Sequence, residues 1–376
     1  MMRKQPEPMD TTESGKFEAL ERVVSPRFVD LIRAAVAEGA SDVHLRAGHR
    51  PRMRIDGELY KLKGDPISHE DLEAFLYGLL RQPQIERFEN THELDFSYAL
   101  PAVSRMRFNL YIQQRKLCAS IRLIPENIPT MEEIYLPKLC YDFVQYTAGL
   151  ILVTGPTGSG KSTTLAAMID YINQHRRSHI LTIEDPVEYV FKEKLCMVSQ
   201  REMGQDTTGF HGALRHSFRQ DPDIVMIGEM RDQETMQAAI TLAETGHLTF
   251  STLHTSEAST TINRIIDSFP PHQQAQIRAQ LAVSLRGIIS QKLVPLKDQR
   301  GRVAAREVLL CNRAVRNLLR EGKVPQIFSA IQTGLEEGMM TLNYSLGDLY
   351  KRGIISYETA LQHSPDRNEF VQKYGK

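Results

Sequence analysis

A glycine-rich segment, residues 155–162, has the residue types and the spacing that bind phosphate. It reads Gly155, Pro156, Thr157, Gly158, Ser159, Gly160, Lys161 and Ser162, and it stands between an apolar run and a helical stretch that opens with Thr163. Its amides are expected to surround the β-phosphate, while Lys161 reaches the β and γ oxygens and the Ser162 hydroxyl ligates Mg²⁺. A glycine turn that only ends a strand is the alternative, and the match at all four fixed positions argues against it. The segment therefore predicts a site for a nucleoside triphosphate.

Two glutamates follow apolar runs further along the chain. Glu184 comes after residues 179–183, and Glu229 follows residues 224–227 and Gly228. If both runs are strands of one α/β sheet, the two acids meet at the sheet edge where ligands bind. Hydrolysis needs one carboxylate that holds Mg²⁺ through water and another that orients the attacking water. Solvated acids are also common at strand ends, which leaves Asp185 and Glu188 as weaker candidates.

Two histidines bracket the apolar run 248–253. His247 and His254 would lie roughly 23 Å apart on an extended strand, which is too far to share a metal ion. His254 is expected to face the γ-phosphate and to sense its presence. For each histidine a structural role is the alternative.

The remaining pattern predicts two domains. Residues 1–26 are polar and indicate a mobile tail. Helical and alternating periods over residues 27–125 predict a small α+β domain with an antiparallel sheet. Three prolines mark residues 126–147 as an interdomain linker. Residues 148–376 alternate short apolar runs, with 302–310 as the last of them, with helical stretches, which is typical of an α/β domain with a mostly parallel sheet.

Composition narrows the possible partners. The 376 residues include 46 Lys and Arg and 46 Asp and Glu, so net charge favours neither nucleic acid nor an anionic membrane as a partner. The four cysteines lack the C-x-x-C spacing of a zinc site or a disulfide framework. No apolar stretch approaches the roughly 18 residues that span a bilayer. We expect a cytoplasmic protein with reduced thiols.

Four segments together carry a resemblance to a known family. They are the glycine loop, the acidic stretch 181–189, the stretch 219–232 that ends in Gly-Glu-Met-Arg-Asp, and the stretch 243–255 with both histidines. In this order the four segments resemble the secretion-superfamily ATPases. In that family a glycine replaces the usual Walker B acid and a glutamate follows it, and Gly228 and Glu229 match these two positions. Residues 39–45 and 314–321 make the chain most similar to the retraction motors of type IV pili, the PilT and PilU proteins.

The resemblance implies a fold and a site. It implies a PAS-like N-terminal domain, a RecA-like ATPase domain, and ATP with Mg²⁺ as the ligand. Glu229 then activates water or holds Mg²⁺ through water. The resemblance also brings four arginines to the phosphates: Arg107, Arg122, Arg215 and Arg219. From the residues alone, the alternative for Arg107 and Arg122 is that they are ordinary cations on the sheet surface. Arg215 and Arg219 occupy one face of a predicted helix over 212–220, where solvent-exposed arginines are the default interpretation.

The resemblance also implies an assembly. It predicts a homohexamer at the cytoplasmic face of the bacterial inner membrane, held there only through a platform protein of the pilus, and a paralogous retraction ATPase as a further partner. Residues 337–361 resemble PilU endings, so an accessory ring that assists a principal motor is an alternative. A nucleic-acid translocase on the same core is a second alternative, and the neutral charge argues against it.

Overall fold

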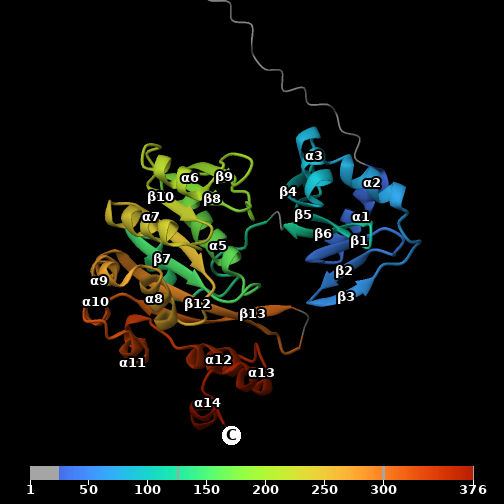
Figure 1. Cartoon of the computed structure of the whole chain (residues 1–376). Helices are drawn as coiled ribbons and strands as arrows, with labels where there is room; N and C mark the ends of the chain where they lie inside the picture. Colours follow the sequence, from blue (N-terminus) through green and yellow to red (C-terminus); the bar gives the residue numbers. More distant parts are fainter. Residues whose placement is uncertain (1–24, 125–126, 299–300, 376) are drawn as a thin grey trace, which may run out of the picture. The chain divides into compact units, whose positions relative to one another are not determined.

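The computed structural model describes residues 25–124, 127–298 and 301–375, which form two compact units that divide between Leu123 and Ile124. Figure 1 shows the elements of each unit. The tail expected over residues 1–26 lies outside the described residues up to position 24, and the first helix, α1, begins at Pro26.

Unit 1 is built on a six-stranded sheet with strand order β3-β2-β1-β6-β5-β4. Strand β1 runs antiparallel to β2 and β6, and β4 runs antiparallel to β5. Every second residue of β5 from Ser104 to Leu110, including Met106 and Phe108, is buried, because successive strand side chains point to opposite faces. Its elements are α1 (Pro26–Ala37), β1 (Asp42–Arg46), β2 (Arg52–Ile55), β3 (Glu58–Lys61), α2 (His69–Tyr77), α3 (Gln82–Thr91), β4 (Glu93–Leu100), β5 (Ser104–Gln113) and β6 (Lys116–Ile124).

Unit 2 contains a seven-stranded sheet with strand order β13-β12-β7-β11-β10-β8-β9. All neighbouring pairs are parallel except β12 and β13, which are antiparallel. The strands are β7 (Gly149–Thr154), β8 (His179–Glu184), β9 (Met197–Glu202), β10 (Ile224–Ile227), β11 (Leu248–Leu253), β12 (Leu285–Pro295) and β13 (Arg302–Leu310). Sequence patterns predicted β7, β8, β10, β11 and β13, and missed β9 and β12.

Helices bury both faces of this sheet. On β7, Leu150 and Leu152 join the core on one face, whereas Ile151 and Val153 join the core on the other. A strand buried on both faces reads as a continuous apolar run, as β7 does. The helices of unit 2 are α4 (Lys138–Phe143), α5 (Lys161–His175), α6 (Phe210–Ser217), α7 (Gln233–Glu244), α8 (Ala258–Asp267), α9 (Pro271–Ser284), α10 (Arg313–Arg320), α11 (Ile327–Thr333), α12 (Leu342–Lys351), α13 (Tyr357–His363), α14 (Arg367–Tyr374) and two 3₁₀ turns, η1 (Val324–Gln326) and η2 (Leu335–Glu337).

Most of the segment expected to be a linker packs into unit 2. Its described residues, 127–147, include α4 and contribute Leu139, Phe143 and Val144 to the core that also holds α5. The prolines that suggested an irregular connection all precede this helix in the sequence, and Pro137 is its N-cap. The buried residues occupy too short a run to show a helical period.

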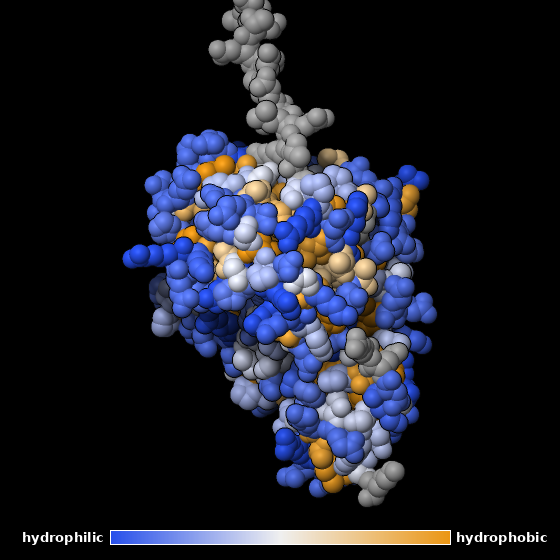
Figure 2. All heavy atoms as spheres, turned by 90° about the vertical axis from the view of Figure 1, so that its right-hand side faces the viewer, coloured by the Kyte–Doolittle hydropathy of each residue, from blue (hydrophilic) through white to orange (hydrophobic). Residues whose placement is uncertain are grey.

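The molecular surface is largely polar on the face that Figure 2 shows. Hydrophilic side chains cover most of this face, and apolar ones show between them. In the part of the chain that the structure describes, none of the helices combines the length and the hydropathy needed to cross a membrane.

Candidate nucleotide-binding site

The glycine loop connects the end of β7 to the start of α5, as its sequence predicts. Gly155 has φ +146° and Gly160, the N-cap of α5, has φ +84°. A side chain on Gly155 would collide with the carbonyl oxygen of Gln291 and with the Ser159 side chain. The loop thus needs glycine both for its backbone angles and for its close approach to β12.

Lys161 is folded against this loop. Its Nζ donates to the carbonyl oxygens of Gly155 and Pro156, at 2.8 and 3.2 Å, and the residue is only 9% exposed. Burial lowers the pKa of the Lys161 amine, and the carboxylates of Glu229 and Glu188 act in the opposite direction. Both glutamates therefore lie close enough to influence the charge of the loop lysine.

Polar side chains from β12 and from the acidic segment hold the first turn of α5. Gln291 accepts from Thr164 Oγ1 at 2.8 Å and donates to the Ser159 carbonyl at 2.7 Å. The Thr163 hydroxyl lies 3.0 Å from the Tyr189 hydroxyl. These contacts keep the amides at the start of α5 oriented toward the loop, where the helix end favours an anion.

Glu229 lies just after the end of β10, and its carboxylate contacts the side chains of His254 and Arg231. Its Oε1 is 3.1 Å from His254 Nε2, and its Oε2 accepts from Arg231 Nε at 2.9 Å. The other ring nitrogen of His254 is 3.4 Å from the Thr157 hydroxyl of the glycine loop. His254 therefore connects the loop with Glu229, and the structure brings together these three predicted site residues.

The backbone of Gly228, the residue before Glu229, is hydrogen-bonded on both sides. The Gly228 amide donates to the Ile183 carbonyl at 2.9 Å, and a Cβ at Gly228 would lie 3.4 Å from the Cα of Glu184. Thr252 Oγ1 donates to the Gly228 carbonyl at 2.7 Å. The backbone at this position is thus fixed between β8 and β11, and the next residue carries the carboxylate.

Glu184 is placed differently from Glu229. It is 5% exposed, and its carboxylate accepts from Thr182 Oγ1, Gln200 Nε2 and the Glu188 amide, at 2.7, 3.1 and 3.3 Å. Burial raises the pKa of Glu184 to about 7. These bonds make Glu184 a residue that holds the segment 184–188 in place, and they leave the exposed Glu188 as the acid of that segment whose charge acts on Lys161. Sequence patterns favoured Glu184 over Glu188 without revealing these three donors, and a catalytic role for Glu184 stays a prediction.

His247 lies at the opposite end of β11 from His254. The Gly155 amide donates to the carbonyl of Leu253, at the loop end of β11, whereas His247 precedes Leu248 and bonds through Nδ1 to the Leu242 carbonyl at 3.0 Å. The ring of Phe218 packs edge-on to His247, with centroids 6.0 Å apart. Within one chain, His247 therefore does not join the loop.

The helix arginines are also near that far edge. Helix α6 ends at Ser217 rather than at 220, so Arg215 is in its last turn and Arg219 lies beyond it. The early end follows from the turn at 216–220, in which the amides of Arg219 and Gln220 donate to His216 and Ser217. Both arginines are exposed, and their predicted contact with phosphate stays a prediction.

Arg107 and Arg122 belong to unit 1. They lie on β5 and β6, between buried residues, and so point away from the core of that unit. Arg122 Nε donates to Asp42 Oδ1 at 3.0 Å. Their role at the phosphates also stays a prediction.

The residues near the loop suit Mg²⁺ held together with a nucleotide. Among the described residues, no group of three or more His, Cys, Asp and Glu side chains could hold a metal ion by itself. The Ser162 hydroxyl and the Glu229 carboxylate are hard oxygen ligands, which Mg²⁺ prefers alongside phosphate oxygens and water. The donor set therefore fits an ion that arrives with the phosphates.

Comparisons with known proteins agree with this geometry. A P-loop between β7 and α5, with a glutamate at the end of β10, defines the class of P-loop ATPases. The family model "Type II/IV secretion system protein" matches residues 130–315. The type IV pilus ATPase PilT of Pseudomonas aeruginosa is 48% identical over 88% of this chain and 96% of its own length. The ATPase PilU of the same organism is 39% identical over 91% and 90%.

A solved structure gives the same result. The crystal structure of the pilus retraction motor PilT with bound ADP superposes with a TM-score of 0.84 at 45% identity, covering 92% of this chain and 98% of that one. The chain belongs to the PilT family of type IV pilus retraction ATPases. The predicted α/β fold, with an ATPase core and a smaller N-terminal domain, is confirmed.

Proposed function

We propose that this chain hydrolyses Mg²⁺-bound ATP to drive type IV pilus retraction and twitching motility. The observation that carries the proposal is the link from Thr157 of the glycine loop through His254 to Glu229, at 3.4 and 3.1 Å, in a chain 48% identical to a PilT ATPase. This link supports a role for the Glu229 carboxylate beside the terminal phosphate.

Each residue of the site then has a chemical task. The loop amides and Lys161 neutralise charge on the β- and γ-phosphates. Glu229 accepts a hydrogen bond from the attacking water and takes up its proton, and His254 orients the Glu229 carboxylate. Ser162 would hold the Mg²⁺, which would supply charge neutralisation at the phosphates. Glu188 is a second acid at the loop, and Glu184 fixes the backbone that carries it.

Assembly and location belong to the same proposal. A homohexameric ring at the cytoplasmic face of the inner membrane, bound to the pilus platform protein, would convert nucleotide cycles into withdrawal of pilin subunits. In such a ring, His247, Arg215 and Arg219 are at the far sheet edge of their own subunit, where they would be available to a neighbouring copy. The exposed cationic side of α10, with Arg313 and Arg320, is our candidate for force transmission.

A PilU-type accessory role is the second candidate. The chain is 48% identical to PilT and 39% identical to PilU of the same organism, which favours the principal motor. Loss of retraction when only this chain is deleted, in cells that keep a paralogue, would support the principal role. Retraction that continues would support the accessory one.

ATP turnover of purified protein tests the core of the proposal. Lys161→Ala should lose nucleotide binding and hydrolysis, since it removes the charge at the phosphates. Arg367→Ala, an exposed substitution on α14, is a control that should hydrolyse ATP at the wild-type rate. Hydrolysis by Lys161→Ala at the wild-type rate would refute the assignment. Salt-dependent DNA binding, measured on the same sample, tests the nucleic-acid alternative.

A further inference from the structure

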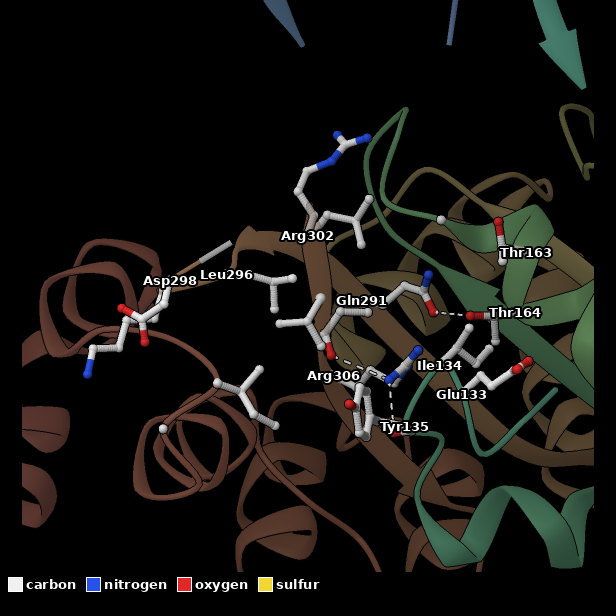
Figure 3. A pocket seen from close by; sticks show the side chains of 17 residues that line it. Glu133, Ile134, Tyr135, Thr163, Thr164, Gln291, Leu296, Asp298, Arg302 and Arg306 are labelled. Carbon is white, nitrogen blue, oxygen red and sulfur yellow. Dashed lines mark hydrogen bonds between the residues drawn. The ribbon is translucent and has the colours of Figure 1, made fainter. Parts of the chain in front are cut away.

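The segment between β8 and β9 carries two side chains that act on the glycine loop and on the start of α5. Its described residues, 185–196, form neither helix nor strand. The charge of Glu188 acts on Lys161, and the Tyr189 hydroxyl lies 3.0 Å from the Thr163 hydroxyl. Figure 3 shows Thr163 on the first turn of α5, where it lines a cavity. Because neither a helix nor a sheet fixes the segment, side chains from other elements set its position.

Gln200 of the edge strand β9 holds this segment with its side-chain amide. Its Nε2 donates to the Tyr189 carbonyl at 2.8 Å and to Glu184 Oε1 at 3.1 Å. Its Oε1 accepts from the Phe191 amide at 2.8 Å. A glutamine side chain has two N–H donors and one acceptor oxygen, so both donors and the oxygen are engaged. One side chain therefore fixes the segment at two backbone groups and joins it to the end of β8.

Glu202 holds the same segment on the other side of Glu188. It lies two residues beyond Gln200, so both side chains stand on one face of β9. Glu202 Oε2 accepts from the Val187 amide at 3.1 Å. The backbone is thus anchored at the residue before Glu188 by Glu202, and at the residue after it by Gln200. Glu188 itself is exposed, so these anchors, rather than packing of its own side chain, determine where its carboxylate lies.

We infer that Gln200 is a positioning residue for ATP hydrolysis. By holding the backbone that follows Glu188, it keeps this carboxylate beside Lys161. It also keeps the Tyr189 hydroxyl against the first turn of α5. The inference rests on the proposed function, because it concerns the same ATP site. Nucleotide affinity comes from the loop amides and Lys161, so loss of the positioning should slow the chemical step and leave binding nearly unchanged.

Gln200→Glu and Gln200→Asn, measured in the full-length protein, break the arrangement in opposite ways. An ionised glutamate keeps the length of the side chain but cannot donate, whereas asparagine keeps the donors on a shorter side chain. In both variants kcat for ATP should fall at least about tenfold, because a misplacement of about 1 Å can cost about a hundredfold. The Kd for ADP, measured by calorimetry with Mg²⁺, should stay within about threefold of wild type. If one variant does not fold, the other still tests the inference.

Ser199→Ala is the control on the same strand. Ser199 Oγ lies 2.9 Å from His179 Nε2 and stands on the opposite face of β9 from Gln200. Loss of this contact should lower the melting temperature and keep kcat within about twofold of wild type. A general effect of strand stability would instead lower kcat in all the variants in step with their melting temperatures, and that result would overturn the positioning role.

Two other outcomes would also overturn the inference. One is wild-type kcat in a folded Gln200→Glu or Gln200→Asn protein, and the other is a change confined to ADP affinity. Failure of the proposed function is recognised separately, because wild type itself would then not hydrolyse ATP, and the inference would fall with it.

Discussion

His254 Nε2 lies 3.1 Å from Glu229 Oε1, and His254 Nδ1 lies 3.4 Å from the Thr157 hydroxyl. The histidine at the end of β11 thus joins the glycine loop to the glutamate at the end of β10. One side chain therefore links the glycine loop to the carboxylate that we propose acts on water.

Glu229→Gln should lower the ATP turnover number by at least about a hundredfold and leave ADP affinity within a fewfold of wild type. The amide keeps the size and the contact with His254, but it cannot take up a proton from water. Glu336→Gln, an exposed glutamate in η2, is the matched control. Turnover near the wild-type value in Glu229→Gln would show that another group accepts the proton.

His254→Asn should reduce kcat by roughly ten- to a hundredfold with little change in ADP affinity, since the histidine acts by orienting Glu229 and not by holding the phosphates. His272→Asn, at an exposed position in α9, controls for loss of an imidazole. Rapid-quench kinetics separate the chemical step from product release. A change confined to ADP affinity would contradict the orienting role.

Substitution of Glu184 should lower thermal stability, whereas substitution of Glu188 should lower kcat. Glu184→Ala removes the acceptor of Thr182 Oγ1 and of the Glu188 amide and one of the two acceptors of Gln200 Nε2. Each buried donor left without a partner costs about 1–3 kcal/mol. The melting temperature should therefore fall by several degrees. Glu188→Gln should melt like wild type and lose at least about tenfold in kcat. The reverse pattern, an unchanged melting temperature with loss of kcat in Glu184→Ala alone, would assign catalysis to Glu184.

The fold was largely predictable because β7, β10 and β11 are short apolar runs buried on both faces, and the glycine loop predicts the helix that comes after β7. The two missed strands have mixed patterns. β9 (Met197–Glu202) is an edge strand of polar and partly exposed residues. β12 contains Gly287, Ser290 and Gln291 inside the buried sheet, which breaks the apolar run.

These missed strands also carry the hydrogen-bond partners of two parts of the candidate site. Gln200 on β9 is one of the donors that bury Glu184, and Gln291 on β12 holds the first turn of α5. A sequence pattern shows which acid ends a strand, but the partner that satisfies it comes from a distant segment.

Glu307 leads to a prediction about pH. Its Oε1 accepts from the Ala258 amide, at the start of α8, at 2.8 Å, and the residue is 4% exposed. Burial raises the pKa of Glu307 from 4.5 to about 7. The folded protein therefore keeps this proton at pH values where the unfolded chain has lost it. The resulting stabilisation is complete below pH 4.5 and disappears as pH rises to about 7.

Glu307→Gln cannot ionise, so it should gain stability relative to wild type as pH rises through this window. The shift of about 2.5 pKa units, from 4.5 to about 7, sets an upper limit on the order of 3 kcal/mol, which is several degrees in melting temperature. Thermal melts at pH 4.5, 6 and 8 should show the variant closest to wild type at pH 4.5 and most stabilised at pH 8. Glu336→Gln should follow the wild-type curve at each pH. An equal offset at all three pH values would mean that Glu307 titrates alike in the folded and unfolded states.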